Sequence, residues 1–348
     1  MPFALTSLSD LTDAPFDDVI DVRSPGEFAE DRLPGAISLP VLSDAEREEV
    51  GTTYVQVDRF RARRIGAAHV SRNAARHLEG PLAGKDGGWR PLVYCWRGGM
   101  RSGSFAHILK EVGWRAETLE GGYRTWRRLV SKALYDDAMP FAVMLIDGNT
   151  GTAKTDILLK ARAMGAQAID LEGLANHRGS VFGHRGGQPS QKLFETRLAQ
   201  EVSRIDLSRP VLVEAESAKV GERFVPPSLW KAMRAAPRIR IEASLATRAA
   251  YTARSYADVT GEGGLLHDAL DSLVPIQGHA QVDAWRAMAV AGNHEALAAD
   301  LMERHYDPRY AASAIRDGAS AAHVISLDGP GEAEIEAAAR AVAALVTP

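Results

Sequence analysis

Short hydrophobic runs alternate with segments of helical composition through the first third of the chain. Residues 19–22 and 91–94 predict short buried strands, and residues 114–119 fit one more strand. Residues 43–80 have helical composition and begin like a capped helix with an acidic first turn, and residues 102–112 predict another helix. Strands that alternate with helices predict an open, mostly parallel α/β sheet with flanking helices.

The pattern starts again after residue 139. Residues 140–147 predict a strand, which a glycine-containing loop joins to a helix over 156–165, and residues 168–171 and 211–214 predict further short strands. Residues 243–311 are mostly helical in composition. We therefore predict two α/β domains, residues 1–134 and residues 135–348, the second ending in a helical part.

The length and composition agree with two globular domains. The chain has 348 residues, 45% of them hydrophobic and 25% charged, which excludes a disordered or collagen-like protein. The net charge of −4 is unevenly distributed. Residues 1–50 carry 3 basic and 12 acidic side chains, whereas residues 51–133 carry 16 and 6. A basic segment thus surrounds the only cysteine, which points to an anionic partner.

The single cysteine, Cys95, excludes an intramolecular disulfide and a zinc site built from several cysteines. The chain opens with acidic residues and its first basic residue is Arg23, so we expect no secretory signal. We also expect no membrane span, because no uncharged apolar run approaches 18 residues. These features predict a cytoplasmic protein, in which a free thiol stays reduced.

Cys95 directly follows the strand over 91–94 and precedes a Gly-Gly turn. Successive backbone N–H groups and a helix N-terminus would converge there into an anion cradle that favours a thiolate. The same cradle would hold an oxyanion, a persulfide or a perselenide. The alternative is an inert core cysteine at a strand end. With Cys95 as the candidate catalytic residue, the predicted cradle consists of Trp96, Arg97, Gly98, Gly99, Met100 and Arg101.

A second candidate site is a phosphate-binding loop between the strand over 140–147 and the helix that follows it. The expected diphosphate-binding residues are Gly148, Asn149, Thr150, Gly151, Thr152, Ala153, Lys154 and Thr155. Ala153 stands where the P-loop pattern has glycine. Either this position has negative φ, or the loop departs from the standard form.

Two further segments carry candidate chemistry. Glu214 or Glu216, at the end of the strand over 211–214, could join Thr155 in holding Mg²⁺, or could merely be a solvated strand end. Residues 170–183 predict a surface loop whose His177 and Arg178 could bind phosphate or substrate, although its acidic residues could simply begin a helix.

Four separated motifs in residues 17–130 resemble a rhodanese domain: DVRSPGEF, LPGAISLP, CWRGGMRS and EGGYRTW. The resemblance implies that Cys95 carries transferable sulfur or selenium. It also implies that Asp21, Arg23 and Glu27 are structural, holding the first strand and turn against the sheet.

The chain as a whole resembles the bacterial tRNA 2-selenouridine synthases, through both loops and through LPVLSDAEREEVGTTYVQ, DLEGLANHRGS and HYDPRY. The resemblance implies replacement of sulfur by selenium in wobble 2-thiouridine, with selenophosphate as donor and an S-geranyl intermediate made from geranyl diphosphate. Lys154 would then help to bind the diphosphate of the geranyl donor, and Cys95 would accept or position selenium as a perselenide. The implied partners are the tRNA anticodon stem-loop and a selenophosphate supplier, with Mg²⁺ a candidate ion and no tightly bound cofactor or membrane.

The basic segment supplies candidate tRNA contacts for an anticodon stem. These are Arg59, Arg61, Arg63, Arg64, Arg72 and Arg76. The alternative is a solvated helix face. Several aromatic residues could stack on bases, but we assign none of them.

Three other functions fit parts of the pattern. Cys95 and Arg101 have the Cys-x₅-Arg spacing of cysteine phosphatases, although Tyr94 replaces the histidine that often precedes the cysteine. A P-loop kinase with a rhodanese docking module is the second alternative. A plain sulfurtransferase is the third.

Overall fold

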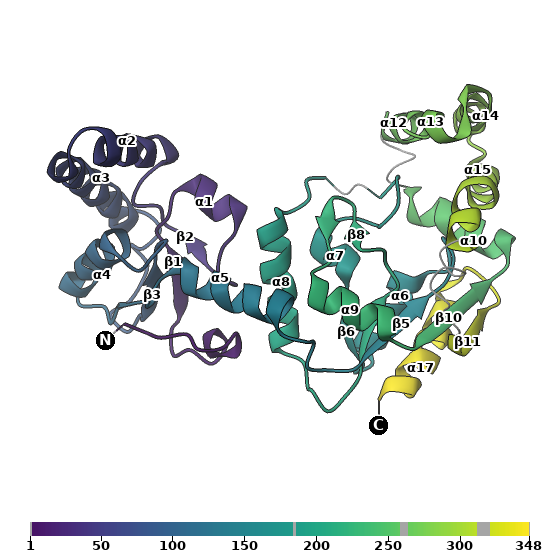
Figure 1. Ribbon diagram of the computed structural model, residues 1–348, viewed down its shortest axis with the longest axis horizontal. Helices are drawn as coiled ribbons and strands as arrows, with labels where there is room; N and C mark the ends of the chain where they lie inside the picture. Colours follow the sequence, from purple (N-terminus) through teal and green to yellow (C-terminus); the bar gives the residue numbers. More distant parts are fainter. Residues whose placement is uncertain (1, 184–185, 258–263, 312–320, 348) are drawn as a thin grey trace. The chain divides into compact units, whose positions relative to one another are not determined.

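The protein is described by a computed structural model over residues 2–183, 186–257, 264–311 and 321–347 (Figure 1). The chain divides into two compact units. The first consists of Met1–Asp137 and Pro189–Arg204, and the second of Ala138–Gln188 and Ile205–Pro348.

The first unit is an α/β unit with a four-stranded sheet in the order β2-β1-β3-β4. All three strand pairs are parallel, and Asp18 to Asp21 of β1 lie opposite Pro91 to Tyr94 of β3. Its strands are β1 (Asp18–Asp21), β2 (Ile37–Ser38), β3 (Pro91–Tyr94) and β4 (Glu117–Thr118). Its helices are η1 (Ser9–Leu11), α1 (Pro25–Glu30), α2 (Asp44–Gln56), α3 (Arg59–Glu79), α4 (Met100–Val112), α5 (Tyr123–Ser131), η2 (Lys132–Asp136) and α8 (Gln191–Ser203).

Local sequence signals explain where the helices of this unit begin and end. Ser43 and Glu46 form a capping box at the start of α2, and the Asp58 carboxylate accepts a hydrogen bond from the Arg61 N–H at the start of α3. Gly113 ends α4 with φ of 109°. The core under these helices includes Val93 and Phe105, both fully buried. Burial of such side chains contributes roughly 1.5–3 kcal/mol each.

Helix α8 belongs to the first unit although it follows the first elements of the second unit in sequence. The Trp126 indole on α5 donates a hydrogen bond to Thr196 Oγ1 on α8 at 3.2 Å. Glu195 forms an ion pair with Arg127 and accepts a hydrogen bond from the Tyr135 hydroxyl at 2.6 Å. These polar contacts hold α8 to α5 and η2.

The second unit has a five-stranded parallel sheet in the order β11-β10-β5-β7-β6. The strands of the unit are β5 (Val143–Asp147), β6 (Gln167–Ile169), β7 (Val211–Glu214), β10 (Arg238–Ala243) and β11 (Ala321–Leu327), with a small antiparallel pair of β8 (Lys219–Val220) and β9 (Arg223–Phe224). Helices close to the sheet are α6 (Lys154–Ala163), α7 (Leu171–Ala175), α9 (Pro227–Ala235), α10 (Leu245–Ser255) and α17 (Glu332–Val346).

A helical part with its own core extends the second unit (Figure 1). It consists of α12 (Leu265–Asp271), α13 (Val274–Gln277), α14 (His279–Val290), α15 (His294–Leu301) and η3 (Met302–Tyr306). Trp285 is fully buried there, and its indole N–H donates to Asp300 at 2.7 Å. This aromatic residue is therefore part of the hydrophobic core.

The predicted fold class is confirmed in both units: parallel sheets with flanking helices, and a helical part towards the C-terminus. Within the described residues, no helix is long and apolar enough to cross a membrane.

Candidate functional site

Cys95 lies at the carboxyl end of β3, and the loop after it leads into α4 at Met100. The loop is tightly curled, because Gly98 has φ of 65° and a side chain there would lie 2.7 Å from the Leu119 carbonyl oxygen. Gly122, with φ of 60°, lets the turn before α5 approach the Cys95 carbonyl. Glycine is required at both positions, which explains the GG and EGG strings around the cysteine.

The Cys95 sulfur is almost enclosed, with the residue 4% exposed. It accepts a hydrogen bond from the Ser102 hydroxyl at 3.2 Å and from the Gly99 N–H at 3.4 Å. Burial raises the pKa of the thiol, but the bonds from Ser102 and from the backbone N–H groups of residues 97, 99 and 102 outweigh it, so the pKa lies below its ordinary value. The loop therefore favours the thiolate, and Ser102 is a contributor that the sequence analysis did not single out.

The two arginines of the predicted cradle differ in their surroundings. Arg97 is exposed. The Arg101 guanidinium instead contacts the Glu27 carboxylate at 2.8 Å, and Glu27 also pairs with Arg47 at 3.1 Å. Although burial raises the pKa of Glu27, its bond to Arg101 lowers the pKa below the ordinary value. Glu27 thus partly compensates the charge of Arg101 and connects the cysteine loop to α1.

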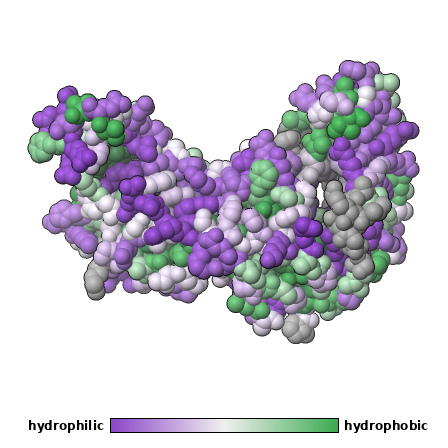
Figure 2. Space-filling model, in the orientation of Figure 1, coloured by the Kyte–Doolittle hydropathy of each residue, from purple (hydrophilic) through white to green (hydrophobic). Residues whose placement is uncertain are grey.

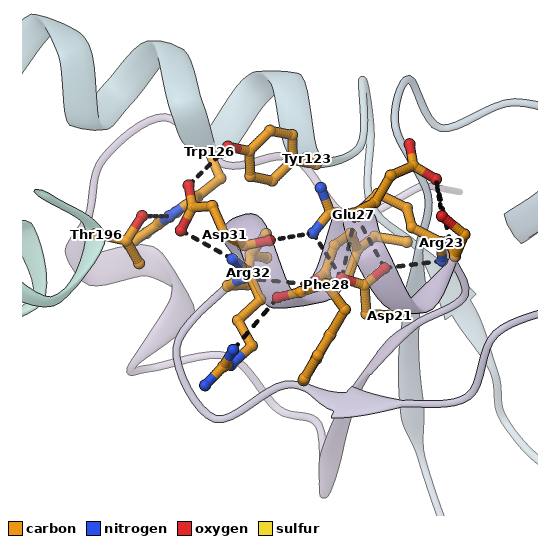
Figure 3. Close-up of polar contacts among 12 residues, drawn as sticks. Asp21, Arg23, Glu27, Phe28, Asp31, Arg32, Tyr123, Trp126 and Thr196 are labelled. Atoms are coloured by element: carbon orange, nitrogen blue, oxygen red, sulfur yellow. Dashed lines mark hydrogen bonds and ion pairs between the residues drawn. The ribbon is translucent and has the colours of Figure 1, made fainter. Parts of the chain in front are cut away.

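A buried polar network lies among β1, α1 and α5 (Figure 3). Arg23 is 1% exposed and pairs with Asp21, itself fully buried, at 2.7 Å. The same guanidinium donates to the Asp31 carbonyl at 2.5 Å and lies over the Tyr123 ring at 4.1 Å. The Tyr94 hydroxyl donates to Asp21 at 2.7 Å. Removal of either charge would leave the other buried without its counter-ion.

Asp31 connects this network to α5. Its carboxylate accepts a hydrogen bond from the Tyr123 hydroxyl at 2.6 Å, and burial raises the pKa of both groups. The Tyr123 N–H in turn donates to the Cys95 carbonyl at 2.8 Å. The network therefore positions the backbone that carries the cysteine.

The second candidate site is the loop between β5 and α6, the predicted P-loop. Ala153 has φ of 55° and ψ of 29°, the left-handed conformation for which glycine is favoured. Of the two expectations for this position, negative φ is wrong, and the loop contains a strained alanine, which costs roughly 1–2 kcal/mol. The Lys154 ammonium donates to the Gly148 carbonyl at 2.7 Å and the Asn149 carbonyl at 3.4 Å. Lys154 thus folds back over its own loop.

Residues far along the chain hold this loop in place. Asp307 accepts hydrogen bonds from Asn149 at 3.0 Å and from Arg248 at 2.9 and 2.8 Å. The Tyr310 ring lies 5.7 Å from the Lys154 ammonium. Asp307 and Tyr310 belong to the HYDPRY string, whose chemical role the sequence analysis did not assign.

Acidic side chains meet at the start of α6. The Thr155 hydroxyl donates to Glu172 at 3.0 Å, and the Glu172 N–H donates to Glu214 at 3.3 Å. Burial, with added repulsion from neighbouring carboxylates, raises the pKa of Glu172 to about 7 and that of Glu214 well above its ordinary value. Burial also raises the pKa of Glu216. Glu214 is 1% exposed, so its alternative as a solvated strand end is wrong.

This arrangement fits a magnesium ion held jointly with phosphate. In the part of the chain that the structure describes, one oxygen of Glu214 is buried with no hydrogen-bond partner, and Thr155 supplies a nearby hydroxyl. Within the described residues, no three His, Cys, Asp or Glu side chains form a complete metal cage. Mg²⁺ commonly takes one or two carboxylates and completes its shell with phosphate and water, so the donors present suit it.

His177 and Arg178 do not lie on a surface loop as expected. The segment begins with α7, with Asp170 as its N-cap, as the alternative expected, and continues into a turn in which His177 is buried and Arg178 half-buried. His177 is 4% exposed and accepts a hydrogen bond from the Gly179 N–H at 3.1 Å. Arg178 lies over the Tyr256 ring at 4.8 Å. Leu171 and Ala175 of α7 are buried as well.

An apolar pocket adjoins the P-loop in the second unit. Thr150 lines it together with Phe182, Leu266, Leu297, Leu301 and Met302. Its volume is about 60 Å³. The sequence analysis could not locate this pocket, because its walls come from five separate segments of the chain.

The six arginines predicted to contact tRNA all lie on α3 and are exposed. Arg59 lies over the Tyr54 ring at 5.4 Å, and Arg72 contacts His69 at 2.8 Å. Figure 2 shows a mainly hydrophilic surface over α2 and α3 with a small hydrophobic cluster, and Val55 and Phe60 there are 82% and 77% exposed. None of the six has an acidic partner among the described side chains.

Comparisons with known proteins match both units. A rhodanese-like domain family matches residues 4–129, and the family described as tRNA 2-selenouridine synthase AAA domain matches residues 141–264. A tRNA 2-selenouridine synthase of Pseudomonas syringae is 31% identical, over 86% of this chain and 88% of that protein. One of Cupriavidus necator is 36% identical, over 84% and 87%. One of Chromohalobacter salexigens is 35% identical, over 84% and 86%.

Proposed function

The chain belongs to the tRNA 2-selenouridine synthase family, and from that premise we propose that it replaces sulfur by selenium in wobble 2-thiouridine of tRNA. Selenophosphate is the selenium donor. The observation that carries the proposal is the presence in one chain of a thiolate-stabilising loop at Cys95 and, at Lys154, a loop with the P-loop pattern between a strand and a helix. Two anion-binding loops suit an exchange in two steps, each with its own anionic reactant.

The first step activates the base with geranyl diphosphate. The sulfur of 2-thiouridine attacks the first carbon of the geranyl group, the carbon–oxygen bond to diphosphate breaks, and the base loses its N3 proton. Diphosphate leaves with the electron pair, and Lys154 with the N–H groups of residues 148–155 stabilises its charge. This step consumes no ATP. When Mg²⁺ is bound, Thr155 and Glu214 would hold it, and it would neutralise part of the diphosphate charge.

The apolar pocket beside Thr150 supports a prenyl rather than a nucleotide donor, because its wall consists mainly of aliphatic and aromatic side chains. Its volume of about 60 Å³ corresponds to about two water molecules, at roughly 30 Å³ each. The pocket therefore has to widen before a geranyl chain can enter.

The second step introduces selenium at the Cys95 loop. A perselenide on Cys95 would require a two-electron oxidant, because selenium in selenophosphate is already fully reduced, and the chain has no second thiol. We therefore assign the thiolate to phosphorus: the sulfur–phosphorus bond forms, the phosphorus–selenium bond breaks, and selenium keeps the electron pair. Selenium then attacks C2 of the base and geranylthiolate leaves, while water releases phosphate from Cys95. The backbone N–H groups of the loop suit the phosphoryl oxygens.

The exposed arginines of α3 are proposed as phosphate contacts for the anticodon stem. We place the reaction in the cytoplasm, where Cys95 stays reduced, and a protein that supplies selenophosphate is a further predicted partner.

Mass spectrometry of nucleosides from tRNA incubated with the protein, selenophosphate and geranyl diphosphate tests the proposal. We expect 2-selenouridine, with S-geranyl-2-thiouridine when selenophosphate is omitted. Absence of both products would refute it. Hydrolysis of aryl phosphates that requires Cys95 would instead favour the phosphatase, and ATP turnover that requires Lys154 but not Cys95 would favour the kinase.

A further inference from the structure

A cationic pocket borders the Cys95 loop within the first unit. Its volume is about 550 Å³, inside the roughly 300–1,000 Å³ range of ligand pockets. Five basic side chains and one acidic side chain line it: Arg124, Arg127, Arg128, Lys132, Lys192 and Asp136. A single phosphate ion would fill only a small part of this space.

The pocket is coupled to the cysteine loop through the backbone. Trp96, the residue after Cys95, lines the pocket with Tyr123. The Tyr123 N–H donates to the Cys95 carbonyl at 2.8 Å, and the Arg124 N–H donates to the Trp96 carbonyl at 3.1 Å. A ligand in the pocket would therefore lie next to the thiolate loop.

Three of the five basic side chains already have acidic partners. Arg127 pairs with Glu195, Lys132 with Asp137 at 2.5 Å, and Lys192 with Glu30 at 2.6 Å.

Arg124 and Arg128 differ from these three in their exposure and in their partners. Both are exposed, and within the described parts of the chain neither has an acidic partner. Because they are four residues apart on α5, they lie on one face of that helix. Two guanidinium groups without acidic partners among the described residues are thus available to one anionic ligand.

The pocket also has an aromatic wall. The Trp96 ring packs beside Tyr123 with ring centres 5.1 Å apart, and it remains partly exposed. A cationic groove combined with a partly exposed aromatic ring suits single-stranded nucleic acids, in which phosphates contact the cations and a base stacks on the ring.

We propose that this pocket binds the RNA strand next to the target nucleoside, with Arg124 and Arg128 on its phosphates and Trp96 under a base. The choice of RNA rests on the proposed function. The arginines of α3 would contact the stem, whereas the pocket would position the nucleotide beside Cys95.

The test is fluorescence anisotropy with a labelled anticodon stem-loop RNA that carries 2-thiouridine. The Arg124→Glu/Arg128→Glu variant is compared with Lys110→Glu/Arg115→Glu, which makes the same charge change at two exposed positions away from the pocket. We expect the α5 variant to bind the RNA at least tenfold more weakly. The slope of the logarithm of the association constant against the logarithm of the salt concentration should become less steep by about 1.4, since each single-strand phosphate contact contributes about 0.7. The control should change less than twofold.

Trp96→Ala should weaken binding about tenfold, and Trp96→Tyr should largely restore it. Thermal melts establish that each variant is folded.

Equal affinity of the α5 variant and its control would overturn the inference, while the proposed function would stand. An α5 variant that keeps its RNA affinity but requires more selenophosphate for the same rate would also overturn it, because the pocket would then serve the small anion. If the wild-type protein binds no RNA, the proposed function itself fails.

Discussion

Ser102→Ala is the most local test of the cysteine loop. The Ser102 hydroxyl is fully buried and lies 3.2 Å from the Cys95 sulfur. A hydrogen bond to a charged acceptor contributes about 1.5–3 kcal/mol, and 1.36 kcal/mol corresponds to about one pKa unit. The Ser102 hydroxyl also contacts the Gly99 carbonyl at 3.3 Å, so we take the lower end of this energy range. The variant should raise the pKa of Cys95 by about 1.

The assay is the rate of alkylation by iodoacetamide as a function of pH. Because Cys95 is the only cysteine, the whole signal comes from this thiol. Ser104→Ala is the matched control, since Ser104 is exposed on the same helix. An unchanged or lower pKa of Cys95 in Ser102→Ala would refute the reasoning that hydrogen bonds to sulfur outweigh its burial.

Three further variants test the buried charges and the strained loop. Arg23→Met should lower the free energy of unfolding, measured in urea, by about 3–5 kcal/mol, because Asp21 would stay buried without its partner. Lys85→Met, which removes one partner of a more exposed ion pair, should lower it by less than about 1 kcal/mol. Glu172 has a pKa of about 7 when folded, above its usual 4.5, so its charge weakens the fold as pH rises from about 4.5 to 7. Glu172→Gln should therefore raise Tm at pH 8 and leave it unchanged at pH 4, and the reverse order would contradict this. Ala153→Gly should change the free energy of unfolding by less than about 1 kcal/mol, because the relief of backbone strain is offset by the greater entropy of the unfolded chain and the loss of a buried methyl group. A large shift in Tm would contradict this.

The sequence predicted both loops well, because each is a local pattern. A buried strand, a glycine turn and a helix start lie within a few residues around Cys95, and the same holds around Lys154. Backbone geometry follows from such short-range signals, whether or not the rest of the fold is known.

Contacts between residues far apart in sequence could not be predicted in this way. Asn149 meets Asp307 and Arg101 meets Glu27, at separations of 158 and 74 residues, and neither pair leaves a periodic signal. The burial of His177 likewise depends on tertiary packing, which overrides the polar composition of its segment. The assignment of α8 to the first unit has the same cause.

The proposed division of work between the two loops is tested most directly by nucleoside mass spectrometry of the Cys95→Ala and Lys154→Ala proteins. With 2-thiouridine tRNA, geranyl diphosphate and selenophosphate, Cys95→Ala should accumulate S-geranyl-2-thiouridine without selenium, and Lys154→Ala should leave 2-thiouridine unchanged. Supplied with tRNA that is already geranylated, Lys154→Ala should form 2-selenouridine. Selenium incorporation by Cys95→Ala, or geranylation by Lys154→Ala at the wild-type rate, would contradict the account.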